Sequence, residues 1–403
     1  MKAFERRTIS IILSVIMVLS CFAGLTFSVG AETSGDYGYK VLDDGTVSIT
    51  YYKGNDTDVT IPYEIDKKIV TEIGAHAFDC HRDIVSVKIP NGVRSIGNAA
   101  FYDCDSLVNI EIPDSVISIG ACAFYNCSSL TSIRLPNNLT YISGVMLSDC
   151  AKLKSITIPK SVEKIRDDFL TRCYSLQEIT VSKENHNYKD VDGVLFDKNM
   201  DTLLIYPYGR DGVYRIPDGV KKIGGAAFNQ CYNLNDIIIP DSVNEIESYA
   251  FLECTGLKKV VIPSSVDTIA DESFSGCYSL KKIIGFSGSE AEVYAKNNGI
   301  KFVSIDLCKH TDLSNMNIKT ATCTESGYSG DKYCKDCEQL IEKGYEIKAK
   351  GHIDDDYDNL CDRCGIKVKL SFSDRLTDII NSINNLINKI VNFFKSLFNG
   401  KVY

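Results

Sequence analysis

The sequence predicts a parallel solenoid, in which the short strands of successive repeats stack along one axis. Three observations lead to this prediction. Eight of the nine prolines follow an isoleucine or a leucine, and most of them recur at a spacing of 23 residues. A cysteine occupies the same position in seven repeats. An isoleucine opens each of eight repeats, at Ile73, Ile96, Ile119, Ile142, Ile165, Ile223, Ile246 and Ile269.

Each repeat contains one predicted strand. In the second repeat, Leu107, Ile110 and Ile112 follow the form L-x-x-L-x-L, and Ala100 with Phe101 supplies apolar bulk from the opposite side. Alternate side chains of a strand share one face, so Ile110 and Ile112 point inward together. One repeat cannot bury this face alone, whereas stacked repeats form a continuous core. Each buried aliphatic side chain contributes about 1.5–3 kcal/mol, which accounts for the strict pattern.

The repeated series has the form I-G-x-x-A-F-x-x-C-x-x-L-x-x-I-x-I-P, as residues 96–113 show. This series resembles the BspA-type leucine-rich repeat of bacterial surface proteins, and the resemblance covers about residues 70–300. It implies a leucine-rich-repeat solenoid of stacked parallel strands joined by short helices or turns. It further implies a secreted, non-enzymatic scaffold that binds a ligand or a host.

The composition and the start of the chain narrow the class of function. The formal net charge is −9 and no run of basic residues occurs, which argues against a nucleic-acid partner. Residues 1–31 begin with basic residues, continue with an apolar run and end in Val29-Gly30-Ala31. This order is typical of a secretory signal that is cut after Ala31. We therefore expect a secreted or cell-surface protein.

The chain after this signal divides into five predicted segments. Strand-like runs before the first repeat predict a cap for the solenoid, and a helix followed by a strand after the last repeat predicts a second cap. The segments are an N-terminal cap at 32–72, the eight repeats at 73–284 with an insertion at about 182–216, a C-terminal cap at 285–307, a Cys/His module at 308–366 and an amphipathic helix at 372–398.

The recurring cysteines form one column of seven thiols. In an exported protein disulfides are the usual interpretation, but seven is an odd number. A residue with the same role in each repeat is better explained as a small buried hydrophobe, so we expect reduced thiols. The alternative, a bridge between stacked neighbours, stays geometrically conceivable. The column consists of Cys104, Cys127, Cys150, Cys173, Cys231, Cys254 and Cys277.

Side chains between the inward aliphatic residues of each strand should face solvent on the concave side. They are polar in most repeats, but Ile238, Val261 and Ile284 stand there in the last three. This pattern predicts an exposed aliphatic stripe that binds a partner, flanked by Lys259 and Lys282, which would orient an acidic partner. The alternative is that β-branched residues simply suit strands.

The insertion carries four tyrosines that offer a second candidate contact surface. They would either contact a partner or pack beneath their own loop. They are Tyr188, Tyr206, Tyr208 and Tyr214.

The Cys/His module predicts a structural Zn²⁺ site. Two C-x-x-C pairs with interleaved histidines fit tetrahedral zinc, which would stabilise a segment too short for its own core. We predict one set of ligands from Cys323, Cys334, Cys337 and His352, and a second from Cys308, His310, Cys361 and Cys364. Three disulfides are the main alternative. The module also resembles a small Cys/His module of clostridial surface proteins.

The segment 372–398 has apolar residues three and four apart, as in an amphipathic helix. It contains no apolar run long enough to span a membrane, so self-association, docking on the protein and contact with a membrane surface are the options.

The function expected from these features is binding of a protein or glycan ligand. We do not expect catalysis, because the five histidines form no credible triad and no phosphate loop occurs. Two alternatives are a structural envelope protein without a specific ligand and a hydrolase on a repeat scaffold.

Overall fold

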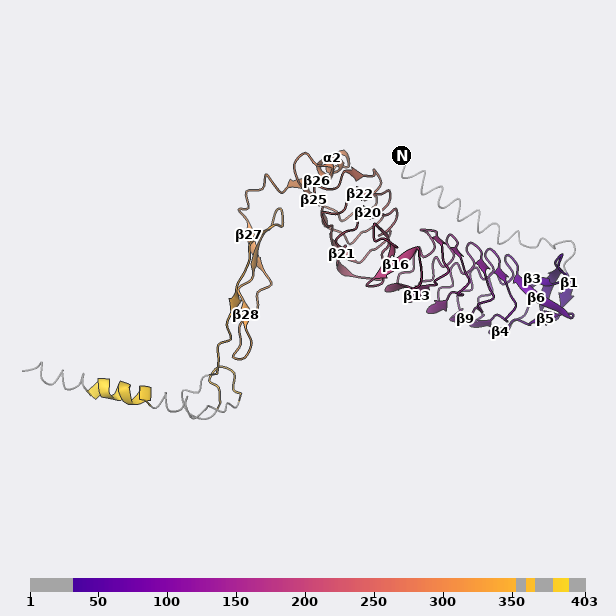
Figure 1. Ribbon diagram of the computed structural model, residues 1–403, viewed down its shortest axis with the longest axis horizontal. Coiled ribbons are helices and arrows are strands. Elements are labelled where there is room, and N and C mark those ends of the chain that lie inside the picture. Colours follow the sequence, from indigo (N-terminus) through magenta and orange to yellow (C-terminus); the bar gives the residue numbers. More distant parts are fainter. Residues whose placement is uncertain (1–31, 353–359, 367–379, 391–403) are drawn as a thin grey trace, which may run out of the picture. The chain divides into compact units, whose positions relative to one another are not determined.

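The structure is a computed structural model that describes residues 32–352, 360–366 and 380–390. It divides into two units, Met1–Leu307 and Cys308–Tyr403. Figure 1 shows the strands of the first unit stacked in sequence order along a solenoid. The expected secretory signal and both ends of the expected C-terminal helix lie outside the described residues.

The N-terminal cap begins as an antiparallel sheet of β1 (Glu32–Ser34), β2 (Tyr37–Val41) and β3 (Val47–Tyr52). The last of these strands pairs in parallel with β6 (Lys68–Ile73), and β5 (Glu64–Ile65) pairs antiparallel with the same strand. The change from antiparallel to parallel pairing starts the repeated stack.

The front ladder contains the strand that follows the leucine of each repeat. Its strands form three parallel sheets, β4-β7-β9, β11-β13-β15 and β19-β21-β23-β25-β26. Neighbours are in register one repeat apart, as Val87 is with Ile110 and Val260 is with Ile283. The strands are β4 (Asp58–Thr60), β7 (Ser86–Lys88), β9 (Asn109–Glu111), β11 (Ser132–Arg134), β13 (Ser155–Ile158), β15 (Glu178–Val181), β19 (Gly212–Arg215), β21 (Leu234–Ile238), β23 (Lys259–Val261), β25 (Lys282–Gly285) and β26 (Lys301–Ser304).

The back ladder contains the isoleucine that opens each repeat. The segments that join the two ladders in the repeats are turns rather than helices. The fold predicted from the repeat, a stacked parallel solenoid, is confirmed. The back strands are β8 (Ser95–Ile96), β10 (Ser118–Ile119), β12 (Tyr141–Ile142), β14 (Lys164–Ile165), β20 (Lys222–Ile223), β22 (Glu245–Ile246) and β24 (Thr268–Ile269).

The insertion forms three antiparallel strands, β16 (Tyr188–Val191), β17 (Val194–Asp197) and β18 (Thr202–Ile205). The third of them pairs in parallel with β20, so the stack resumes after the insertion. Side chains of β17 alternate between two apolar clusters. Leu195 belongs to the cluster of the earlier repeats, and Phe196 belongs to the cluster of the later repeats.

Two stacks of aromatic rings lie in the core, one in the earlier repeats with Phe78, Phe101 and Phe124, and one in the later repeats. In the later stack, the neighbouring rings of Phe228, Phe251 and Phe274 lie 4.8 Å apart between centroids, and their planes are nearly parallel. This spacing matches the separation of hydrogen-bonded strands, about 4.7–4.9 Å. Each cap contributes a tyrosine to one stack. Tyr52 stacks on Phe78 of the earlier stack at 5.2 Å, and Tyr294 meets Phe274 of the later stack edge-on at 5.6 Å.

The C-terminal cap provides this second tyrosine from α2 (Glu290–Asn297), which begins after Ser289. The helix buries Ala291, Tyr294 and Ala295 against the last repeat. The strand β26 then pairs with β25 and ends the front ladder.

The cysteine column is buried beside the aromatic stack. The thiol of Cys150 donates a hydrogen bond to the carbonyl of Phe124 at 3.2 Å, and the thiol of Cys254 donates to the carbonyl of Phe228 at 2.9 Å. Each acceptor lies in the preceding repeat, so the thiols link successive turns without a covalent bond. Burial raises the pKa of the Cys127 and Cys150 thiols well above the usual value, which keeps them protonated.

The second unit contains a β-ribbon. A sheet of the order β27-β29-β30 and a pair β28-β31 are both antiparallel. Residues 380–390 are helical, and their isoleucine and leucine side chains are exposed. Within the described chain, no helix is both long enough and apolar enough to cross a bilayer. The strands are β27 (Leu313–Met316), β28 (Gly327–Tyr328), β29 (Asp331–Cys334), β30 (Leu340–Glu342) and β31 (Glu346–Ile347).

The thiol column should resist alkylation in the folded chain, because its sulfurs are buried. An alkylating reagent should label the exposed Cys80 rapidly but should label Cys127, Cys150 and their column neighbours only after denaturation. Mass spectrometry of the digested chain measures the labelling of Cys80 and of the column cysteines. Peptides from successive repeats joined by a disulfide would contradict this expectation.

Candidate binding face and metal centres

The outward side of the front ladder is the candidate binding face. Its strands alternate between buried and exposed side chains, as in β9, where Ile110 is buried and both neighbours are exposed. The same alternation occurs in β11 and β13. This arrangement leaves the outward positions free to vary without disturbing the core.

The predicted aliphatic stripe does not form as expected. Ile238 is outward and 37% exposed, and Val261 is partly buried beside it. Ile284, in contrast, is fully buried. The reason is the C-terminal cap, whose strand β26 places Val303 in register next to Ile284 and extends the ladder beyond it. The exposed stripe therefore ends at Val261, and its prediction as a three-residue anchor was wrong.

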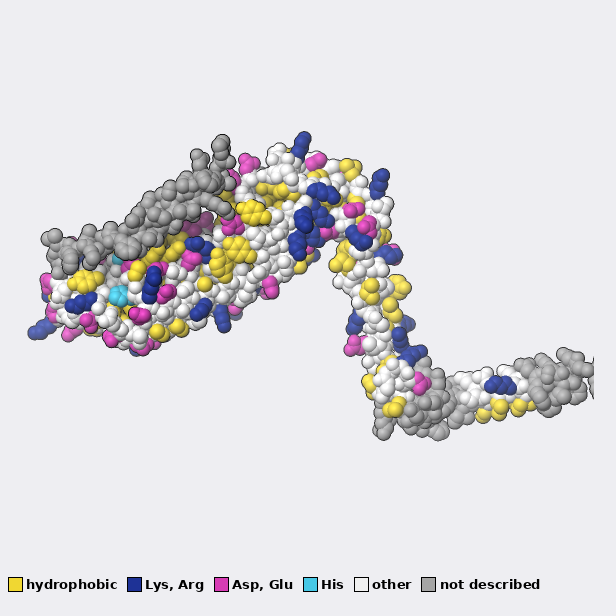
Figure 2. All heavy atoms as spheres, turned by 180° about the vertical axis from the view of Figure 1, so that it is seen from behind, with side chains coloured by type: hydrophobic (Ala, Val, Ile, Leu, Met, Phe, Trp, Pro, Cys, Tyr) yellow, Lys and Arg dark blue, Asp and Glu magenta, His cyan; other side chains and the backbone are white. Residues whose placement is uncertain are grey.

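At the C-terminal end of the candidate binding face, lysines rather than aliphatic residues occupy a row of outward positions. Lys259, Lys282 and Lys301 are direct neighbours in register on three successive strands. The ammonium of Lys259 lies 3.2 Å from a carboxylate oxygen of Asp236. Figure 2 shows Lys and Arg side chains gathered near the C-terminal end of the solenoid.

The sequence analysis identified only Lys259 and Lys282 among the lysines at this end of the face. Lys258 and Lys281 immediately precede Lys259 and Lys282, and both are exposed. Lys301 is also exposed. The repeated Lys-Lys pair, 23 residues apart, was the available signal for the first two. We call Lys258, Lys259, Lys281, Lys282 and Lys301 the lysine patch.

The tyrosines of the insertion pack mainly into the protein. Tyr206 and Tyr208 are buried, and Tyr214 packs on the ring of Tyr206 at 4.8 Å. The backbone N–H of Ile165 donates a hydrogen bond to the hydroxyl of Tyr188 at 3.0 Å. Of the two interpretations of these tyrosines, packing into the protein rather than contact with a partner is therefore the one that fits the structure.

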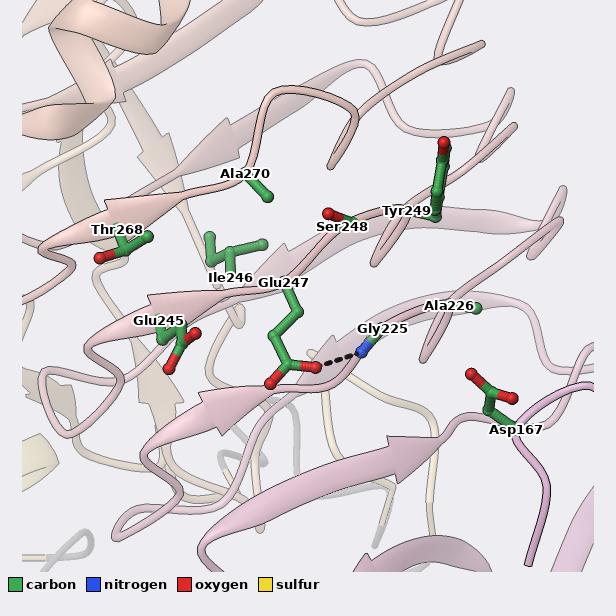
Figure 3. A pocket seen from close by; sticks show the side chains of 10 residues that line it. All are labelled: Asp167, Gly225, Ala226, Glu245, Ile246, Glu247, Ser248, Tyr249, Thr268 and Ala270. Carbon is green, nitrogen blue, oxygen red and sulfur yellow. Dashed lines mark hydrogen bonds between the residues drawn. The ribbon is translucent and has the colours of Figure 1, made fainter.

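A depression of about 450 Å³ lies over the back ladder of the later repeats. Figure 3 shows Glu247 and Glu245 along one side, with Asp167 across from them. Both glutamates are engaged, since Glu247 accepts a hydrogen bond from the N–H of Gly225 at 2.9 Å and Glu245 pairs with Lys222 at 2.6 Å. The lining side chains include no histidine or cysteine. The two glutamates thus serve local structure.

The structure brings all eight predicted metal ligands into two groups of four, but with different members. One group contains Cys308, His310, Cys334 and Cys337, and the other contains Cys323, His352, Cys361 and Cys364. Within each group the ligand atoms lie within 4.8 Å of one another. The predicted sets, which joined Cys323 to Cys334 and Cys308 to Cys361, were wrong.

The antiparallel ribbon explains the different grouping. Cys334 ends β29, where Leu313 of β27 pairs with it, so Cys308 and His310 reach the same end. Cys323 lies in the turn at the opposite end of the ribbon, where its carbonyl accepts a hydrogen bond from Gly351 at 3.0 Å. Neighbours in sequence therefore belong to different groups.

The distances within each group suit a tetrahedral metal ion. Ligands of tetrahedral zinc with bonds of 2.3 Å to sulfur lie about 3.8 Å apart, whereas a disulfide requires about 2.05 Å. The sulfurs of Cys308 and Cys334 are 3.5 Å apart, and those of Cys323 and Cys361 are 3.7 Å apart. A histidine nitrogen completes each group, His310 at 3.2 Å from Cys337 and His352 at 3.5 Å from Cys364.

The thiols of the first group differ in acidity. Burial raises the pKa of Cys334, but backbone N–H groups at Cys337 and Asp336 and the imidazole of His310 outweigh it and lower the value to about 6. Burial, with the neighbouring thiols Cys308 and Cys334, raises the pKa of Cys337 to about 12. One thiolate is thus favoured in this group without a cation, and further ionisation would require a positive charge.

Comparison with known sequence families identifies the repeat. A sequence model described as BspA type Leucine rich repeat region matches residues 71–198 and 213–335, in six copies. A solved leucine rich cell surface protein from Faecalibacterium prausnitzii is 25% identical, with 68% of this chain and 98% of that chain covered and a TM-score of 0.43. The pneumococcal vaccine antigen PcpA is 23% identical, with 64% and 81% covered and a TM-score of 0.49. No curated protein matches the chain.

The correction at Ile284 has a measurable consequence. Ile284→Ser should lower the free energy of unfolding by about 2–5 kcal/mol, because it leaves a cavity at a fully buried site. The same change at the outward Ile238 should alter it by less than about 0.5 kcal/mol. Denaturant unfolding followed by circular dichroism compares the free energies of unfolding of the two variants. Equal effects at both positions would contradict the assigned burial.

Proposed function

Because the chain belongs to the BspA-type leucine-rich repeat family, we propose that it is a secreted or cell-surface protein that binds a partner through the front ladder. The residues 1–31, with their basic start and apolar run, support export. The alternating strands support a binding role, since a rigid ladder holds outward side chains in fixed rows.

The lysine patch is the observation that carries this proposal. Like charges directly opposite each other on neighbouring strands destabilise a sheet. Three lysines nevertheless occupy one row, on strands about 4.8 Å apart, in a chain whose net charge is −9. Asp236 pairs with Lys259 at one end of this row, and an anionic partner that lies along the row would add further ion pairs to it.

We propose a linear anionic glycan as the partner. Its charges recur along its length, as the lysines do along the ladder, and lysine binds sulfate, carboxylate or phosphate groups as a flexible point charge. Ile238 and Val261 border the row and would contact apolar edges of the sugar rings. An acidic polypeptide is the competing partner, which the experiment below tests separately.

The two other classes of function have weaker support. A hydrolase on this scaffold needs an acid–base pair, and the carboxylates of the depression in Figure 3 are bound to Gly225 and Lys222. A structural envelope protein without a ligand would give the outward lysine patch no role.

For the second unit we propose Zn²⁺ as a structural ion. Three cysteines and one histidine in each group are a typical donor set for structural zinc, and they leave no open coordination position for catalysis. The spacing of the sulfurs favours this ion over disulfides.

Replacing Lys281 and Lys301 by Gln should weaken binding to a heparin-type sulfated glycan by about 2- to 30-fold at low salt, since an exposed ion pair contributes about 0.2–1 kcal/mol. The difference should shrink in 1 M salt, where the Debye length is about 3 Å. Biosensor titrations of the native chain and of the double variant with the glycan, at low and at high salt, measure this difference in affinity.

Lys40→Gln with Lys53→Gln is the matched control, because these exposed lysines lie in the N-terminal cap and remove the same charge. Equal loss of affinity in both double variants, or absence of glycan binding by the native chain, would contradict the proposal. Stronger lysine-dependent binding to poly-L-glutamate would instead identify an acidic polypeptide as the partner.

A further inference from the structure

We infer that the two metal groups of the second unit depend on each other, so that the chain takes up its two zinc ions together. This inference rests on the zinc binding proposed above. It concerns how the ribbon is held in shape, and it follows from the order of the ligands, from the strands between the groups and from what the unit buries.

The ligands of the two groups alternate along the chain. The chain first supplies Cys308 and His310 to the first group and Cys323 to the second. It then returns to the first group with Cys334 and Cys337, and ends in the second with His352, Cys361 and Cys364. Neither group can therefore be assembled from one continuous segment that excludes ligands of the other.

Three strand-containing segments connect the groups. The first runs through β27, the second returns through β28 and β29, and the third leaves again through β30 and β31. Antiparallel pairing fixes their register, with Leu313 beside Cys334 and Gly327 beside Ile347. An ion that holds one end of the ribbon in register thus brings the ligands at the other end into place.

A buried carboxylate joins the three segments midway. Asp331 accepts hydrogen bonds from the amide of Asn317 at 3.1 Å, the hydroxyl of Tyr328 at 2.5 Å and the backbone N–H of Gly344 at 2.9 Å. These donors come from the first, second and third segments in turn. Asp331 is therefore a positioning residue between the two groups.

The unit has almost no apolar core besides the ligands. Ala321 is the one buried apolar residue among its described residues that is not a cysteine. Its large apolar side chains, such as Met316, Ile318 and Tyr345, are exposed. Burial therefore contributes little to the ribbon, and metal binding must supply most of its folding free energy.

Mutual dependence predicts how the ions distribute among chains. Native mass spectrometry of the whole chain, titrated from the metal-free state with one equivalent of Zn²⁺ per chain, should show mainly chains with no ion or two ions. Independent sites would leave half or more of the chains with a single ion. That second result overturns the inference, whereas absence of zinc binding would overturn the zinc proposal itself.

Two variants test the cause of the coupling. Cys361→Ser with Cys364→Ser should weaken zinc binding by the first group on the order of tenfold, within the usual range of coupling between sites, as measured by competition with a chelator. Asp331→Ala keeps all eight ligands but should increase the population of chains with one ion. Cys80→Ser, outside both groups, is the control. Unchanged affinity in the first variant, or an unchanged distribution in the second, would contradict transmission through the ribbon.

Discussion

The solenoid depends on the stacking of each apolar turn against the next. Phenylalanines at ring distances close to the strand spacing, thiols that donate to carbonyls of the preceding turn and paired isoleucines all repeat this one contact. The end turns have a neighbour on one side alone, and the caps complete them with Tyr52 and Tyr294. Because the contact involves inward side chains, the outward row can differ from repeat to repeat and carry function.

The repeat period predicts most of the fold, because the inward pattern and the strand register are the same constraint. The burial of Ile284 could not be predicted, since it follows from pairing with the non-repeated strand β26. The sequence predicted the eight metal ligands, but it did not predict which four of them belong to each group. Which ligands meet depends on the antiparallel register of the ribbon, and Cys323 is nearer in sequence to Cys334 than to Cys361.

The two units are thus stabilised by different means. The first buries two large clusters of apolar side chains, whereas the second buries four cysteines and a single alanine among its described apolar residues. This difference fits a division in which apolar packing holds the solenoid, whereas the proposed zinc ions set the shape of the ribbon.

Hydrogen–deuterium exchange of the whole chain with and without a zinc chelator tests this division most directly. The account predicts that removal of zinc increases amide exchange in the ribbon strands between Leu313 and Ile347 and leaves the strands from Ile73 to Gly285 protected. Ribbon amides that stay protected without metal, or solenoid amides that lose protection with it, would contradict the account.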